Sequence, residues 1–197
     1  MRAKDKFLEK INLLIFAFIL GFSQNIYADN IYKKVLNYNN SLKNSSANFI
    51  QTNINYLQEG IIFFGDKRIK IIYTNPQKIT IILSEKKGMY INHELKESEF
   101  FVTNKSYIKN FFDIFHKENY LQNMSIKNLD NELEFSEKTQ LDQTFFNINL
   151  VYENDPIKLR RLEIMGDDEK IQMGFFNHKQ ESVFDKKFFS MIDPFLN

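Results

Sequence analysis

The stretch GIIFFGDKRIKIIYTNP, residues 60–76, determines how the rest of the sequence is interpreted. An apolar run at 61–64 leads into the turn sequence Gly65-Asp66-Lys67, and apolar and polar side chains then alternate from Arg68 to Tyr73. Alternation with a period of two is typical of a strand that buries one face. Because Asn75-Pro76 interrupts the pattern, the stretch predicts two antiparallel strands joined by a tight turn.

Segments of the same kind recur on both sides of this hairpin. Their spacing of about 8–12 residues is typical of an antiparallel sheet or barrel. Two segments, 30–43 and 107–115, instead have the apolar spacing of short amphipathic helices. We expect further strands at 46–56, 79–83, 89–92, 100–102, 124–129, 133–136, 143–152, 158–164 and 171–176, and an apolar tail, 183–196, that closes the sheet.

The chain begins with a segment that has the order of a secretory signal peptide. Arg2, Lys4, Lys6 and Lys10 precede an apolar run over 11–22, and a small residue, Ala28, precedes the expected cut. The alternative is a membrane anchor, but the run is shorter than the roughly 20 residues that span a bilayer. We therefore expect a removable leader at 1–28, a single mature domain at 29–197 and export of the protein.

Composition restricts the class of function. The chain has no cysteine, so an exported domain of this kind must be held together by its core. The formal charge of +1 gives no support for nucleic-acid binding, which favours a basic face. Aromatic residues make up 15% of the chain, with 21 Phe, 9 Tyr and no Trp. On a bent sheet covered by short helices, this apolar surface predicts an unclosed barrel whose interior holds side chains or a ligand.

No constellation of catalytic or metal-binding residues stands out. His93, His116 and His178 are far apart and lack the spacing of a metal site. There is no cysteine nucleophile and no glycine-rich phosphate loop, so we expect no catalytic residue, no metal and no cofactor. A pair of glycosidase-type carboxylates stays open, because their separation in space decides that chemistry.

The 60–76 stretch resembles a segment of the LolA family of periplasmic lipoprotein carriers. That family has a glycine, alternating apolar residues, a basic-Pro turn and a second alternating strand ending in an aromatic residue and a proline. Ala47-Asn48-Phe49-Ile50-Gln51 resembles an upstream strand of the family, and the order of the downstream segments is also similar. The Phe-rich segment 107–115 lies where the family has a lid helix.

The resemblance implies a mainly β fold, with one antiparallel sheet curved into an unclosed barrel and covered by short lid helices. It implies a periplasmic carrier that takes lipoproteins from an ATP-driven exporter in the inner membrane and delivers them to an acceptor in the outer membrane. Such a carrier is most simply a monomer. The lid would present Phe111, Phe112 and Phe115. The cavity would be lined by Phe49, Ile61, Phe63, Ile69, Ile71, Tyr73, Ile81, Leu83 and Tyr90.

The sequence departs from the family at the turn. Where the family has an Arg followed by Pro, which is linked to holding the lid shut, this chain has Gly65 and Asp66. Arg68 follows shortly after, but the alternation places it on the outer face. Two other functions stay open: a LolA-like periplasmic lipid-binding or sensor protein, and a secreted hydrolase.

Overall fold

The structure is a computed structural model. It describes residues 30–53, 56–105, 108–141, 144–166, 170–180, 182–185 and 187–196. The predicted leader, 1–28, lies outside these residues. The chain divides into two compact units, Met1–Val35 and Leu36–Asn197, and the described part of the first, 30–35, is helical. Within the described residues, no helix is long and apolar enough to cross a membrane.

The second unit is mainly β. Its first residues, 36–41, are helical, as expected from the spacing over 30–43. The helix expected at 107–115 is also present, as α2 (Ile108–His116), and two short 3-10 turns flank it, η1 (Thr103–Lys105) and η2 (Leu121–Asn123). The strands are β1 (Ser45–Thr52), β2 (Leu57–Gly65), β3 (Arg68–Asn75), β4 (Ile79–Leu83), β5 (Lys87–Asn92), β6 (Glu97–Val102), β7 (Ser125–Leu129), β8 (Glu132–Leu141), β9 (Thr144–Asn154), β10 (Ile157–Met165) and β11 (Lys170–Lys179).

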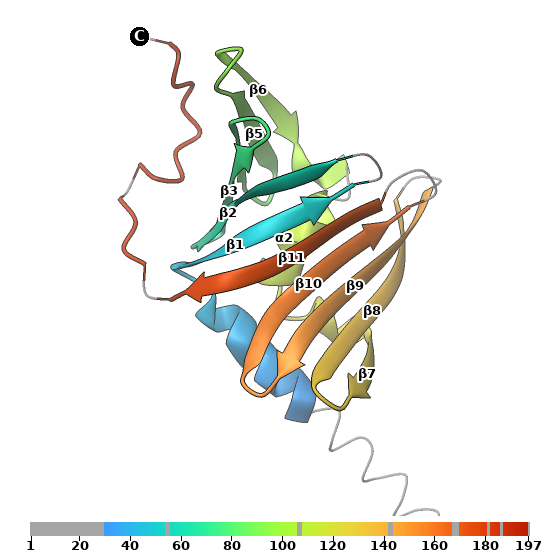
Figure 1. Ribbon diagram of the computed structural model, residues 1–197. Helices are drawn as coiled ribbons and strands as arrows, with labels where there is room; N and C mark the ends of the chain where they lie inside the picture. The colour runs from blue at the N-terminus through green and yellow to red at the C-terminus, as the bar shows by residue number, and fades with distance from the viewer. Residues whose placement is uncertain are drawn as a thin grey trace, which may run out of the picture. The chain divides into compact units, whose positions relative to one another are not determined.

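These strands form one antiparallel sheet of eleven strands in the order β6-β5-β4-β3-β2-β1-β11-β10-β9-β8-β7. Neighbours in the chain are neighbours in the sheet within two meanders, β1–β6 and β7–β11. The pairing of β1 with β11 joins the meanders, and Phe49 lies opposite Phe175 at this junction. Figure 1 shows the two groups of strands side by side in one curved sheet that is not closed into a barrel. The predicted fold class is confirmed.

One face of the sheet, which we call the inner face, carries the core and α2. Directly opposed residues share a face, so the register fixes its members. On the first meander, Ile71 lies between Ile62 and Ile81. On the second, Leu162 lies between Leu150 and Met173. All of these residues except Ile81 are buried, so a continuous apolar layer runs across both meanders.

The C-terminal tail departs from the expectation. It was expected to close the sheet, but its described residues, 182–185 and 187–196, contain no strand. Instead, Phe184 and Phe188 pack against Phe63 on the opposite, outer face, with ring centroids 5.9 and 5.0 Å away. Lys70 of the same face donates to the carbonyl of Phe188 at 3.0 Å. Apolar residues of the tail therefore cover the sheet and do not extend it.

An apolar cavity beneath helix α2

A cavity of about 100 Å³ lies between the inner face and α2. Residues of both meanders form its floor, because the pairing of β1 with β11 places β3 and β10 in the same sheet. Ile108 and Phe111 of α2 form its roof. The floor consists of Gln51 of β1, Ile71 and Tyr73 of β3, Ile81 and Leu83 of β4, Leu162 and Ile164 of β10, and Ile171 and Met173 of β11.

The lining offers almost no polar group to a ligand. Its one amide, Gln51, is held by neighbours. The Tyr73 hydroxyl donates to Oε1 of Gln51 at 2.9 Å, and Nε2 of Gln51 donates to Gln58 at 3.3 Å. Buried polar groups that already have hydrogen bonds gain little from a further partner. The cavity therefore suits an apolar group held by burial and dispersion, without directional bonds that would fix one pose.

Helix α2 presents a phenylalanine-rich side to the sheet. Phe111 contacts Phe115 at 5.5 Å between ring centroids, and Phe115 contacts Phe64 of β2 at 4.9 Å. Phe112 is also buried, at 3% exposure, and it stacks on the His116 ring at 4.3 Å. Aromatic pairs of this kind contribute about 0.5–1.5 kcal/mol beyond their buried area. The helix is thus held to the inner face chiefly by apolar contacts.

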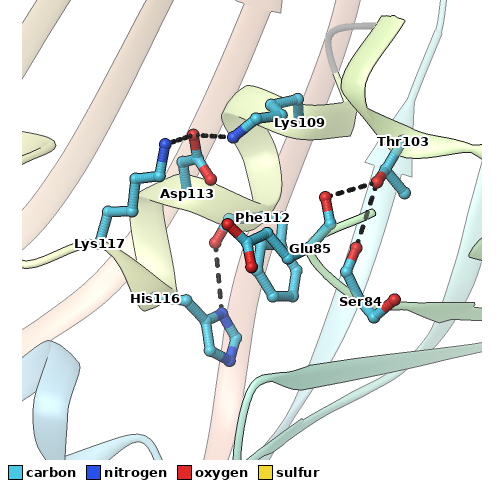
Figure 2. Close-up of polar contacts among 8 residues, drawn as sticks. All are labelled: Ser84, Glu85, Thr103, Lys109, Phe112, Asp113, His116 and Lys117. Carbon is cyan, nitrogen blue, oxygen red and sulfur yellow. Dashed lines mark hydrogen bonds and ion pairs between the residues drawn. The ribbon is translucent and has the colours of Figure 1, made fainter. Parts of the chain in front are cut away.

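One carboxylate of α2 is buried together with the phenylalanines. Asp113 is 4% exposed, and its Oδ2 accepts from the ammonium groups of Lys109 and Lys117, one turn before it and one turn after it. Figure 2 shows the two lysines reaching the same oxygen from opposite sides. The hydrogen bond from Lys117 to Asp113 raises the pKa of that lysine. The two cations make burial of this carboxylate tolerable on a helix that otherwise packs by apolar contact.

Polar contacts join both ends of the α2 region to turns of the sheet. Before the helix, the hydroxyl of the fully buried Thr103 lies 3.2 and 2.8 Å from the carbonyl oxygens of Ser84 and Glu85 (Figure 2). At its last residue, Nε2 of His116 lies 3.3 Å from the carbonyl oxygen of Gly65, in the turn between β2 and β3. Between these ends, Phe111 and Phe115 pack on the inner face, and the Asn39 amide donates to the Ile114 carbonyl at 3.4 Å.

His116 is poised between two carbonyl oxygens. Its Nδ1 lies 3.2 Å from the carbonyl oxygen of Phe112, and its Nε2 faces Gly65, so a neutral ring donates to only one of them. Burial lowers the pKa of His116, and this effect outweighs the two carbonyls and the charges of Asp66 and Asp113, which favour the protonated ring. The neutral ring is therefore the form that this site prefers.

Five of the predicted site residues line the cavity: Ile71, Tyr73, Ile81, Leu83 and Phe111. Three more share the inner face without reaching the cavity. Phe49 is fully buried against Tyr73 at 5.2 Å, and Ile69 is fully buried beside Leu83 in the register, while Tyr90 is half-buried opposite Ile81. Phe112 and Phe115 lie on α2 as expected, in its contacts with His116 and Phe64.

Ile61 and Phe63 were expected in the cavity, but the structure places both on the outer face. Ile61 lies opposite Ile72, and Phe63 lies opposite Lys70. The inner face of β2 is instead formed by Gly60, Ile62 and Phe64. Since 61–64 is a continuous apolar run, the sequence did not reveal which residues face inward; the partner strand, whose alternation is clear, settles the phase.

Six lining residues were not predicted: Gln51, Ile108, Leu162, Ile164, Ile171 and Met173. Four of them belong to β10 and β11, which the sequence identified as strands. What the sequence lacked was the pairing of β1 with β11, which brings the end of the chain beside its beginning. The alternation of Ile171, Met173 and Phe175 indicates that these residues share one face of β11. It does not indicate which strands pair with β11.

The described residues contain no group of three or more His, Cys, Asp or Glu side chains that could hold a metal ion. Of the three histidines, His116 ends α2 and faces the Gly65 carbonyl, His93 contacts Thr80 at 2.9 Å, and His178 contacts Tyr38 at 3.4 Å. No ionisable side chain other than the Tyr73 phenol is among the described residues that line the cavity. The arrangement therefore supports binding of an apolar group more readily than acid–base chemistry.

Comparison with known proteins gives likeness in fold only. No family model and no curated protein matches the sequence. Among solved structures, an uncharacterized conserved protein from Thermus thermophilus matches with a TM-score of 0.52 at 8% identity, over 80% of this chain and 90% of that chain. LprF from Mycobacterium bovis matches with a TM-score of 0.40 at 11% identity, over 80% and 95% of the two chains. The first likeness shows a shared fold and nothing about activity, and the second is weaker still.

Proposed function

We propose that this protein is a carrier that covers the acyl chains of lipoproteins while they pass between two membranes. The observation that carries the proposal is the cavity beneath α2, whose lining is apolar except for Gln51 and the Tyr73 hydroxyl, which bond to each other. Burying a methylene group contributes about 0.8 kcal/mol, so an exposed acyl chain has a large driving force to enter. A binding function needs no catalytic group, and we propose none.

The size of the cavity supports a movable roof. An engineered cavity of about 150 Å³ in another protein holds one benzene molecule, whereas this one has about 100 Å³. An acyl chain fits only if α2 moves away from the sheet. The contacts agree with such a motion, because α2 meets the floor largely through phenylalanines. Apolar contacts can be replaced by contacts with an acyl chain at little cost.

The contact between His116 and Gly65 suggests how this chain closes its roof. It joins the last residue of α2 to the turn between β2 and β3. This is the turn where the LolA family has its Arg-Pro pair. Arg68 lies on the outer face, with its guanidinium 3.9 Å from the sulfur of Met191, so we do not assign it this role. We propose that His116 takes it.

The partners and the location are proposed from the resemblance to the LolA family and from the leader-like segment at 1–28. Loading by an ATP-driven exporter in the inner membrane and delivery to an outer-membrane acceptor would let the carrier work without an energy source of its own. A lining without directional bonds suits this task, since a carrier must also release its cargo. The periplasm is the compartment in which such a carrier would act.

A release assay tests the proposal. Spheroplasts with labelled lipoprotein in their inner membrane are incubated with purified residues 29–197, with and without ATP. We expect a soluble complex in the supernatant that depends on ATP. Absence of release, together with binding of a fatty-acid-like dye, would move the function to a lipid-binding or sensor protein. Absence of both would overturn the assignment of the cavity.

A further inference from the structure

A second pocket, of about 380 Å³, lies away from α2. It is formed where Tyr38 and Ser45 meet the start of β10 and the end of β11, and it shares no lining residue with the cavity beneath α2. Lys158 comes from β10, and His178 and Lys179 come from β11. Its volume falls in the range of about 300–1,000 Å³ that is usual for small-molecule sites.

Two buried polar atoms in this pocket lack a well-formed hydrogen bond. Ser45 is 2% exposed, and its Oγ makes no hydrogen bond with any described residue. Nε2 of His178 is also buried without a hydrogen bond of ordinary geometry; the neighbours of the ring are the Leu159 backbone and the Tyr38 hydroxyl, which lies 3.4 Å from Nδ1. A buried polar group without a partner costs about 1–3 kcal/mol. These atoms indicate that a polar ligand belongs in the pocket.

The charges around the pocket are positive. Lys158 and Lys179 line it, and no carboxylate is among its described lining residues. Burial lowers the pKa of His178, a hydrogen bond with the backbone of Leu159 opposes this effect, and the positive charges of Arg160 and Lys158 add to the lowering. The nearby carboxylate of Glu153 is already paired with Arg160. An anion in this pocket would be stabilised by the positive charges near the half-buried His178 ring.

We propose that this pocket binds a phosphate group carried by a small organic molecule. The available groups are two ammonium ions, two hydroxyls and an imidazole, which together donate to several oxygens of one anion. The volume leaves room for a substituent beside the phosphate. The same chemistry fits a soluble phosphate ester and the head group of a phospholipid. The proposal does not depend on the carrier function, because the two pockets have no residue in common.

The test follows the ring of His178 by NMR during pH titrations at constant ionic strength. The probes are inorganic phosphate, glycerol 3-phosphate and dihexanoyl phosphatidylglycerol, with sodium chloride as the reference. A bound anion offsets the charges of Lys158 and Arg160, so we expect the pKa of His178 to rise and to saturate with the probe. His116, which is also half-buried but is the last residue of α2, is the internal control and should not respond.

Variants locate the effect. Lys158→Gln should weaken binding by about tenfold or more, as expected for loss of a hydrogen bond to a charged group. Lys127→Gln, at an exposed position of β7, is the matched control and should leave binding unchanged. Saturation by inorganic phosphate and glycerol 3-phosphate would identify a soluble phosphate ester. Saturation by phosphatidylglycerol alone would identify a lipid head group. Absence of saturation with all three probes up to about 10 mM, or an equal effect of both variants, would overturn the proposal.

Discussion

The two faces of strand β3 lie under different covers. On the inner face, Ile71 and Tyr73 lie beneath α2, and a cavity separates the helix from the floor. On the outer face, Lys70 lies beneath the tail, with its ammonium 3.0 Å from the Phe188 carbonyl and 4.1 Å from the centre of the Phe188 ring. Both faces are apolar over much of their area, but the space beside the two covers differs in its lining. The cavity beneath α2 is lined almost wholly by apolar side chains, whereas a pocket beside the tail is lined by charged residues that include Arg68, Asp185 and Lys187.

The aromatic part of the tail packs closely on the outer face. Phe184 stacks on Phe188 at 4.8 Å, and both rings meet Phe63 and Phe189 edge-on. A side chain at Gly65 would lie 2.7 Å from the Phe189 ring, so the tail fits closely against the sheet. Flat rings fill this layer, whereas branched aliphatic side chains dominate the floor of the cavity. We therefore expect the outer face to contribute mainly to stability, whereas the inner face is where we propose that a ligand binds.

The largest expected effect comes from placing a charge in the cavity. Ile71→Glu should reduce binding of a fatty-acid-like dye by well over tenfold, because a carboxylate in an apolar site costs several kcal/mol. The fold should persist, since the side chain borders open space. Dye titration and thermal melting measure the two properties.

The matched control is Ile50→Glu, on the outer side of β1 and 37% exposed. It should change neither dye binding nor the melt. Loss of a cooperative melt in Ile71→Glu would show that this residue belongs to a packed core and would remove the contrast between the two faces.

Removing a ring from the outer face should lower stability and leave dye binding unchanged. Phe63→Ala should lower the free energy of unfolding by about 2 kcal/mol, less than for a fully buried ring because Phe63 is half-buried. Dye binding should be unchanged. A double-mutant cycle with Phe188→Ala should give a coupling of about 0.5–1.5 kcal/mol. Phe145→Ala, at a ring that is 47% exposed, is the control, and a similar loss there would argue against a special role for the tail.

A larger side chain in the cavity should raise the free energy of unfolding and lower the affinity for the dye. Ile81→Phe adds volume at a half-buried lining residue, so we expect the free energy of unfolding to rise by about 1 kcal/mol and dye affinity to fall. Ile72→Phe places the same change on the opposite face of the adjacent strand and should spare binding. If Ile81→Phe stabilises the protein without affecting the dye, the cavity is only a packing defect.

The smallest effect concerns pH and belongs to the inner face. Because burial lowers the pKa of His116, the unfolded state takes up the proton more readily than the native state does. The contribution of His116 is complete above the ordinary histidine pKa of about 6.5 and is lost as the pH falls below it.

His116→Gln keeps a donor for the Gly65 carbonyl but does not titrate. Between pH 8 and pH 5, its melting temperature should therefore fall less than that of the wild-type protein. Identical falls would show that His116 does not respond in this range. The comparison with His116→Gln is needed because burial also lowers the pKa of His178, which contributes to both proteins.

The sequence was most informative where a strand alternates cleanly. Arg68 to Tyr73 has such alternation, and the expected division, with Ile71 and Tyr73 inward and Lys70 outward, is confirmed by the register. The helix at 107–115 was also expected, because its Phe residues recur at helical spacing. Local periodicity identifies an element and its buried side when only one side is buried.

The sequence was least informative where a segment does not alternate or where a contact joins distant segments. The run 61–64 is apolar on both sides because the tail covers one of them, so the sequence could not fix the phase of Ile61 and Phe63. The pairing of Phe49 with Phe175 is a long-range contact without a local signal, and half of the cavity floor depends on it. The apolar tail was expected to close the sheet for the same reason, since apolar character alone does not distinguish pairing from covering.

The junction between β1 and β11 also governs how this chain reaches its native state. Each meander consists of hairpins between neighbouring segments and can begin to form locally, but Phe49 and Phe175 meet only after nearly the whole chain has been made. Contacts between distant segments form slowly, because a long loop must close before they are gained. A chain that stops before β11 is left with two half-sheets, each exposing an apolar layer. Synthesis of β11 therefore allows the two meanders to pair into one sheet and to bury the apolar layers that each of them exposes alone.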